Sequence, residues 1–243
     1  MSRFSTLEFS LVDHVATVLL KRPDARNALN EAMCEELRAA AEQATADPAV
    51  KLVLVRGAGP VFCAGADLKE RGGKSAEWVR NRRLKGFAAY EALEALPMPA
   101  IAVVHGAVLG SGVEIAGACD FIVATPDAML GTPEVLRGTV GATQRLPRVL
   151  GKRLAKDLMF TGRRLSAQEA CAAGFVSRVV PKEGIEDLLN EIAKTIVAAP
   201  VASMRLAKRC IDQGVELDPQ GALEVEIAAI DEQLASGVWM GKE

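Results

Sequence analysis

Three short apolar runs, each containing β-branched residues, constrain the fold of this chain most. They occupy residues 50–55, 101–104 and 121–124, and their length and composition predict buried strands. Apolar residues at helical spacing fill the intervals, first from Leu29 to Ala44 and then over residues 75–96. Strands that alternate with helices indicate a mostly parallel sheet, so we expect an α/β fold.

The two ends of the chain show different patterns. Residues 7–20 alternate around a central Asp-His pair and predict a hairpin. The last third has no strong strand run beyond residues 176–180. Its Ala- and Leu-rich stretches predict helices over residues 185–198, 201–214 and 222–235. We therefore expect an α/β core over residues 1–147 and a helical C-terminal region over residues 148–243, which is a candidate oligomerisation element.

Composition and charge argue against several classes of partner. The chain has 243 residues and a formal net charge of −2, whereas a nucleic-acid binder usually carries a strongly basic face. Aromatic residues make up only 4% of the chain, too few for the stacking platforms that bind single strands. No stretch approaches the length of a membrane span. We expect a protein that binds neither nucleic acid nor membrane.

The cysteines indicate the cellular compartment. There are five, an odd number, and they are widely spaced with no CxxC pair and no Cys/His cluster. This pattern predicts neither a disulfide framework nor a zinc site, and it is typical of a reducing compartment. The first nine residues contain no apolar signal core. The expected location is the cytoplasm, and no metal site is expected.

Two common motifs fail around Ser111. Residues 110–112 open a predicted helix after a strand, but the third glycine of a dinucleotide-binding fingerprint would fall at Ile115. The residues that flank Ser111 do not form the nucleophile elbow of hydrolases. The only histidines are His14 and His105, and a hydrogen-bonded histidine at a turn or strand end explains each of them better than catalysis does.

Two glutamates are candidates for chemistry. Glu114 is the only carboxylate between residues 105 and 120, in an apolar run where an unpaired charge is costly. It is therefore either a partner in a buried ion pair or a working carboxyl group, and the sequence favours neither. Glu134 follows Thr132 and Pro133, an N-cap and first-turn pattern, so a helix-dipole partner is the better explanation for it alone. Two glutamates that each follow a turn could still serve as the acid and base of one site.

Two glycine-rich turns, residues 62–67 and 106–112, allow the backbone to come close to a ligand. Two N–H groups from such turns could face one oxygen and stabilise an enolate, although ordinary tight loops are the alternative. A set of basic residues near the first strands and the first glycine turn suits a polyphosphate, but a solvated charged turn is equally plausible. The set comprises Lys21, Arg22, Arg26, Lys69 and Arg71.

Taken together, these segments resemble the enoyl-CoA hydratase/isomerase family, also called the crotonase family. Residues 22–30 resemble its CoA-binding turn, residues 62–71 and 105–114 its two oxyanion loops, and residues 132–136 with 143–146 its second acidic motif. The similarity runs from about residue 11 to residue 235, and the motifs look most like the methylglutaconyl-CoA hydratase branch. The RNA binding of that branch is not carried over, because the helix that would correspond has no Lys.

The resemblance implies a crotonase-like spiral of ββα turns followed by trimerising helices, and hence a homotrimer or a dimer of trimers. It implies that the backbone N–H groups of Ala66 and Ser111 form an oxyanion hole. It implies that Glu114 and Glu134 are the catalytic pair. Contacts with coenzyme A or the substrate are implied for Lys21, Arg22, Arg26, Ala28, Ala64, Asp67, Leu68 and Lys69.

The implied activity is the addition of water to a 2-enoyl-CoA thioester. Coenzyme A is part of the substrate, and neither a metal nor a redox cofactor is needed. Many isomerases of the family lack one of the two glutamates, so the presence of both favours hydration. A 3-enoyl to 2-enoyl-CoA isomerase and a non-catalytic acyl-CoA-binding protein are the alternatives.

The chain departs from the family pattern at two places that bear on the site. Ser111 stands where a glycine is usual, but the expected donor there is a backbone N–H. The segment after Glu134 is shortened to Gly141-Ala142. We expect Glu134 to face the pocket nonetheless, with the change absorbed between Gly138 and Thr143.

Overall fold

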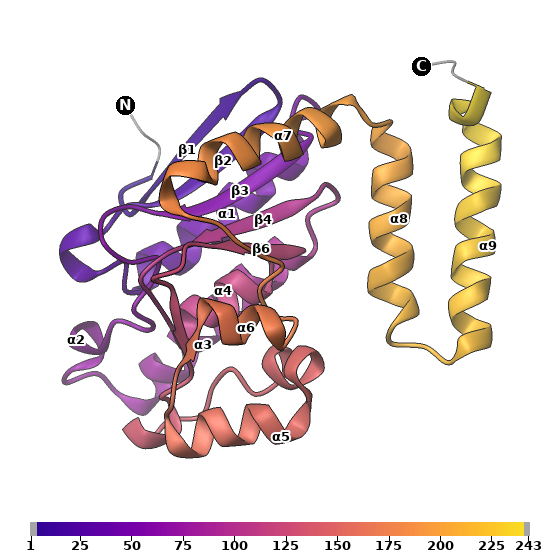
Figure 1. Ribbon diagram of the computed structural model, residues 1–243. Coiled ribbons are helices and arrows are strands. Elements are labelled where there is room, and N and C mark those ends of the chain that lie inside the picture. Colours follow the sequence, from indigo (N-terminus) through magenta and orange to yellow (C-terminus); the bar gives the residue numbers. More distant parts are fainter. Residues whose placement is uncertain (1–3, 241–243) are drawn as a thin grey trace.

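A six-stranded sheet forms the centre of the molecule (Figure 1). A computed structural model describes residues 4–240 of the chain. The first two strands are antiparallel, and the other neighbouring pairs of this sheet are parallel. The strand order is β1 (Leu7–Val12), β2 (Val15–Leu20), β3 (Leu52–Gly57), β4 (Ala100–Val104), β6 (Phe121–Ala124) and β9 (Arg178–Val179). The predicted hairpin and the predicted α/β fold are both confirmed.

Local sequence explains the strands. Every residue of β4 is buried, as expected for a central parallel strand covered on both faces. The β1–β2 hairpin turns at Asp13 and His14, whose φ angles are 47° and 68°. Aspartate and histidine occur at positive φ more often than most other residues do, and a two-residue hairpin turn requires this geometry.

A second sheet contains strands too short for the sequence patterns to predict. Its three strands are β5 (Ala107–Leu109), β7 (Met129–Gly131) and β8 (Leu165–Ser166). β5 lies inside the second glycine-rich turn and ends immediately before Gly110, so this small sheet fixes the position at which α4 begins.

The helices are α1 (Glu31–Ala46), α2 (Leu68–Arg71), α3 (Ala76–Glu94), α4 (Ser111–Gly117), α5 (Arg145–Thr161), α6 (Ala167–Ala172), α7 (Ile185–Ala198), α8 (Val201–Gly214) and α9 (Pro219–Ser236). Short 3₁₀ turns occur at η1 (Pro23–Ala25), η2 (Val135–Arg137), η3 (Lys182–Gly184) and η4 (Val238–Met240). Side chains cap the two long N-terminal helices, since Asn30 accepts from Met33 N–H and Ser75 accepts from Trp78 N–H. Among residues 4–240, no helix combines the length and the apolar character needed to cross a membrane.

The C-terminal helices differ in how they meet the rest of the chain. Ile185, Leu189 and Ile192 of α7 pack in one cluster with Leu52 and Ile101 of the main sheet. The hairpin of α8 and α9 stands apart from this body (Figure 1). The helices expected in the last third are therefore confirmed. Both sheets, however, take a strand from beyond residue 147, where the sequence analysis divides the chain.

Candidate active site

The two glycine-rich turns lie side by side. Cys63 N–H donates to Ala107 O at 3.1 Å, and Leu109 N–H donates to Cys63 O at 2.9 Å. A side chain at Gly112 would place its Cβ 2.6 Å from Cys63 O, and one at Gly65 would lie 3.0 Å from Leu109 O. Gly65 also has a φ of +98°. Glycine is required at these two positions because the backbones approach more closely than a Cβ permits.

This contact brings Ala66 and Ser111 to the same cavity. Ser111 is the first residue of α4, where a helix leaves its N–H groups without intrahelical partners. Within residues 4–240, neither the Ala66 N–H nor the Ser111 N–H donates to a backbone carbonyl. Two such donors on residues that line one cavity are what an oxyanion hole requires, and the oxyanion hole stays a prediction.

Both candidate glutamates line this cavity as well. Glu114 lies in the first turn of α4, one helical turn beyond Ser111, and is buried. Glu134 immediately precedes η2. The cavity is lined by Ala66, Asp67, Leu68, Arg71, Trp78, Val79, Arg82, Arg83, Phe87, Tyr90, Ser111, Glu114, Glu134, Thr139, Val140, Gly141 and Ala142.

Glu114 has a cationic partner. Arg145 donates to its Oε2 at 3.0 Å and also to a carboxylate oxygen of Glu94. The guanidinium lies over the ring of the buried Tyr90, with 5.8 Å between its central carbon and the ring centroid. The Glu114 side chain is only 9% exposed. Glu114 therefore forms the buried ion pair that the sequence offered as one alternative, and it also lines the cavity. Its role as a working carboxyl group stays a prediction.

Glu134 has no such partner. Its Oε2 is buried and accepts no hydrogen bond from residues 4–240. Burial raises the pKa of this carboxyl above 4.5, and the nearby Glu114 raises it further. A Cβ on Gly110 would lie 2.5 Å from Glu134 Oε1, and one on Gly141 would lie 3.1 Å from Glu134 Cγ. The absence of side chains at these two glycines makes room for the carboxyl.

The expected capping role of Thr132 is wrong. The N-cap of η2 is Glu134 itself, and the hydroxyl of Thr132 is buried without a hydrogen-bond partner among residues 4–240. Glu134 is held instead by its own carbonyl, which accepts from Arg137 N–H at 3.0 Å and from Thr139 N–H at 2.9 Å. These bonds close a tight turn on the C-terminal side of the residue.

The shortened segment after Glu134 adopts left-handed backbone at two places. Gly138 has a φ of 65° and Ala142 a φ of 53°. Both positions lie between residues 138 and 143, where the sequence analysis expects the change to be absorbed. Glu134 stays in the same cavity as Ala66 and Ser111.

Comparison with known proteins decides the family. A family model described as enoyl-CoA hydratase/isomerase matches residues 12–237. The chain belongs to the enoyl-CoA hydratase/isomerase family. The Homo sapiens protein named enoyl-CoA hydratase domain-containing protein 2, mitochondrial, is 41% identical over 223 residues, which cover 87% of this chain and 75% of that protein. Crotonyl-CoA hydratase from Syntrophomonas wolfei is 36% identical over 89% of this chain and 85% of its own length.

A solved structure of the family agrees with the fold. The crystal structure of enoyl-CoA hydratase from Bacillus anthracis matches with a TM-score of 0.90 and 38% sequence identity. The match covers 93% of this chain and 90% of that one. The fold is therefore the crotonase fold expected from the resemblance.

The segment that resembles the family's CoA-binding turn lies along the first oxyanion loop. Ala64 N–H donates to Arg26 O, Leu29 N–H donates to Gly65 O, and Asp67 N–H donates to Leu29 O, at 2.8 to 3.0 Å. Ala28 lies within this paired segment. Backbone hydrogen bonds therefore join the two stretches into one paired unit.

The charged residues of this unit are engaged to different extents. Arg22 donates to Asp67 at 3.0 Å and to Ala28 O, so it ties the turn to the loop. Asp67 in turn caps α2 by accepting from Lys69 N–H and Glu70 N–H. Lys21 is exposed and pairs with Glu8. The side chains of Arg26 and Lys69 are exposed, and Leu68 lines the cavity.

The sequence analysis missed the largest wall of the cavity, which one face of α3 provides. Trp78, Val79, Arg82, Arg83, Phe87 and Tyr90 line it. Their spacing of three and four residues is the signal that one face of a helix borders a site. Arg145 lies in the motif of residues 143–146, but its sequence position gives no sign of the ion pair that it forms with Glu114.

Proposed function

We propose that this chain is an enoyl-CoA hydratase, which adds water across the double bond of a 2-enoyl-CoA thioester. One observation carries the proposal: Glu114 and Glu134 line the same cavity as the unpaired N–H groups of Ala66 and Ser111. An acid, a base and two oxyanion donors are the groups that this addition requires.

The oxyanion donors act on the thioester carbonyl. Hydrogen bonds from Ala66 and Ser111 N–H draw negative charge onto its oxygen, which makes C3 more electrophilic and stabilises the enolate that forms. A single donor of this kind contributes a factor on the order of 10²–10³ in rate. Because the donors belong to the backbone, serine can replace glycine at position 111 without loss of the group.

The different surroundings of the two glutamates indicate which of them accepts a proton and which donates one. Glu114 is held by Arg145 and accepts a proton from the water that attacks C3. The Oε2 of Glu134 accepts no hydrogen bond within residues 4–240, and burial raises the pKa of this carboxyl, so Glu134 supplies the proton that C2 receives. General acid–base catalysis of this type contributes roughly 10²–10⁴ in rate. The chemistry draws on these groups and uses neither a metal nor a redox cofactor.

The remaining parts of the proposal concern the substrate and its setting. Arg26 and Lys69 are exposed beside the first oxyanion loop and are suited to the phosphates of coenzyme A. A homotrimer or dimer of trimers, a cytoplasmic location and the methylglutaconyl-CoA branch stay predictions, and fatty acid metabolism is the expected setting. The human relative is mitochondrial by name.

Steady-state hydration of crotonyl-CoA tests the proposal. Glu114→Gln and Glu134→Gln should each lower kcat on the order of 10²-fold or more with little change in KM. The losses in the double mutant should be far from additive, since both groups act on one transition state. Glu77→Gln is the matched control, because Glu77 is exposed on α3 and does not line the cavity.

Three outcomes would contradict the proposal. Near-wild-type turnover in either single mutant would end the two-glutamate mechanism. Turnover of a 3-enoyl-CoA with none of crotonyl-CoA would identify an isomerase. Tight binding of CoA thioesters without any turnover would identify a non-catalytic acyl-CoA-binding protein.

A further inference from the structure

Two cavities meet behind the glutamates. A second cavity adjoins the cavity described above. Glu94, Arg145 and Arg148 line the second cavity but not the first. The two share the lining residues Arg83, Phe87, Glu114, Val140, Gly141 and Ala142. They are therefore neighbours across one common wall.

A hydrogen bond crosses this wall. Arg83 on α3 donates from Nη1 to Val140 O at 2.8 Å, which joins the helix to the shortened segment after η2. The two residues are 57 positions apart in the chain. Both residues line both cavities, so this solvent-exposed bond lies where the two cavities adjoin.

The positions of the oxyanion donors and the two glutamates indicate the direction in which a bound acyl chain would run. Ala66, Ser111 and Glu134 line only the first cavity, whereas Glu114 lines both. An acyl group whose thioester oxygen lies at the Ala66 and Ser111 N–H groups reaches Glu114 with its double bond. Any further methylenes must then continue toward the shared wall.

The wall suits the end of an apolar chain. Phe87 and Val140 are 44% and 67% exposed, which is high for apolar side chains that border a cavity. Beyond them the second cavity presents the charged side chains of Glu94, Arg145 and Arg148. A long acyl chain would have to separate Arg83 from Val140 and would then meet these charges.

We propose that Arg83 is a specificity-determining residue, whose hydrogen bond to Val140 O closes the acyl pocket and selects short-chain 2-enoyl-CoA thioesters. This inference rests on the proposed function. The bond blocks the passage into the second cavity, so chains longer than the crotonyl group fit only when it opens.

The experiment compares acyl-chain lengths in three variants. Arg83→Ala removes the bond and the bulk, Arg83→Lys keeps a donor and a charge at the same place, and Arg80→Ala is the matched control. Arg80 is exposed on the same helix and lines neither cavity. For each protein, kcat/KM is measured with crotonyl-CoA and with 2-decenoyl-CoA, and thermal unfolding verifies the fold.

The expected result is a change in the ratio of the two kcat/KM values. Arg83→Ala should shift it toward 2-decenoyl-CoA by about 10-fold, the scale on which pocket size discriminates between methylene groups. Arg83→Lys should shift it less, and Arg80→Ala should leave it unchanged. The affinities of the unreactive thioesters butyryl-CoA and decanoyl-CoA, measured by calorimetry, should shift in the same direction.

Failure of this inference is distinct from failure of the proposed function. An unchanged ratio in a folded, active Arg83→Ala variant would overturn the inference, and so would an equal shift in Arg80→Ala. A wild-type protein that hydrates no enoyl-CoA would overturn the proposed function instead. The affinity ratio would then still test the wall, because binding of the saturated thioesters needs no turnover.

Discussion

Glu114 and Glu134 are the same residue type in one cavity, but their neighbours differ. Glu114 accepts a hydrogen bond from Arg145, while the buried Oε2 of Glu134 has no donor within residues 4–240. Contrasting environments of this kind separate the acid from the base in many two-carboxylate sites. The ion pair also explains how a carboxylate is accommodated in the apolar run of α4.

Because the Glu134 carboxyl is buried, the stability of the protein should depend on pH. Below pH 4.5 Glu134 is protonated in both the folded and the unfolded chain. As the pH rises above 4.5, the unfolded chain loses this proton first, which favours unfolding. The free energy of unfolding therefore falls until the pH has passed the folded-state pKa of Glu134. Glu134→Gln cannot ionise. It should raise the Tm at pH 7 on the order of 2 °C and have no such effect near pH 4.

Glu114→Gln provides the opposite control in the same thermal scans. It weakens the ion pair with Arg145 and should lower the Tm at pH 7, because a partly buried guanidinium loses a charged partner. If the Tm of Glu134→Gln at pH 7 is equal to or below that of the wild type, the ionised Glu134 carboxyl does not destabilise the fold, and the prediction is wrong.

At the scale of elements, the site depends on how closely α4 approaches the first glycine turn. Gly112 lies in the first turn of α4, and its backbone sits against Cys63 O. Gly117 ends the same helix, where a Cβ would meet only the ring of Phe175 at 3.5 Å. The two glycines differ in the space around them while sharing one helix.

This difference predicts unequal effects of the same substitution. Gly112→Ala must push the two turns apart, and a displacement near 1 Å of the oxyanion donors lowers kcat for crotonyl-CoA by about 10²-fold. Gly117→Ala should keep the activity and change stability by at most about 1 kcal/mol, since alanine is the better helix former. Equal kcat values for the two variants would show that the close contact does not position the donors.

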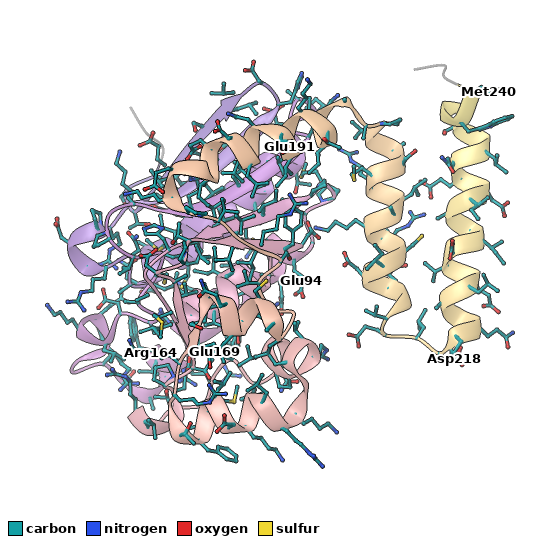
Figure 2. All side chains as sticks on the ribbon, in the orientation of Figure 1. Glu94, Arg164, Glu169, Glu191, Asp218 and Met240 are labelled. Atoms are coloured by element: carbon teal, nitrogen blue, oxygen red, sulfur yellow. The ribbon has the colours of Figure 1, made fainter. Side chains whose placement is uncertain are left out.

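At the scale of the whole molecule, the α8–α9 hairpin carries more apolar surface than it covers. It projects from the body (Figure 1), and side chains extend from α8 and from α9, which runs between the labelled Asp218 and Met240 (Figure 2). On α9 the exposed apolar residues Leu223, Ile227, Ile230 and Leu234 recur at helical spacing and form one stripe. We predict that another copy of the chain covers this exposed stripe.

Light scattering should therefore report three or six copies of the chain at micromolar concentration. Ile227→Asp places a charge in the stripe and should shift the protein to smaller species, because burial of an unpaired charge is costly. Glu224→Ala, on the same helix and exposed, should leave the mass unchanged. A monomeric wild-type protein would contradict the prediction.

The strands β1 to β4 and β6, the long helices other than α5, and the candidate glutamates could be predicted from the sequence. These features are local: a buried strand such as β4 needs a short apolar run, and α1 needs apolar residues at helical spacing and a capping asparagine. Glu114 was conspicuous for a related reason, because a lone carboxylate in an apolar segment needs an explanation.

Only the tertiary structure decided the rest, since it depends on residues far apart in the chain. Arg145 and Glu114 are separated by 31 positions, and Arg83 and Val140 by 57. β8 has two residues and joins the second sheet through its pairing with β7, so no local pattern marks it. Ion pairs, short strands and cavity walls form where the chain is brought together, and their energies come from partners that a local pattern does not contain.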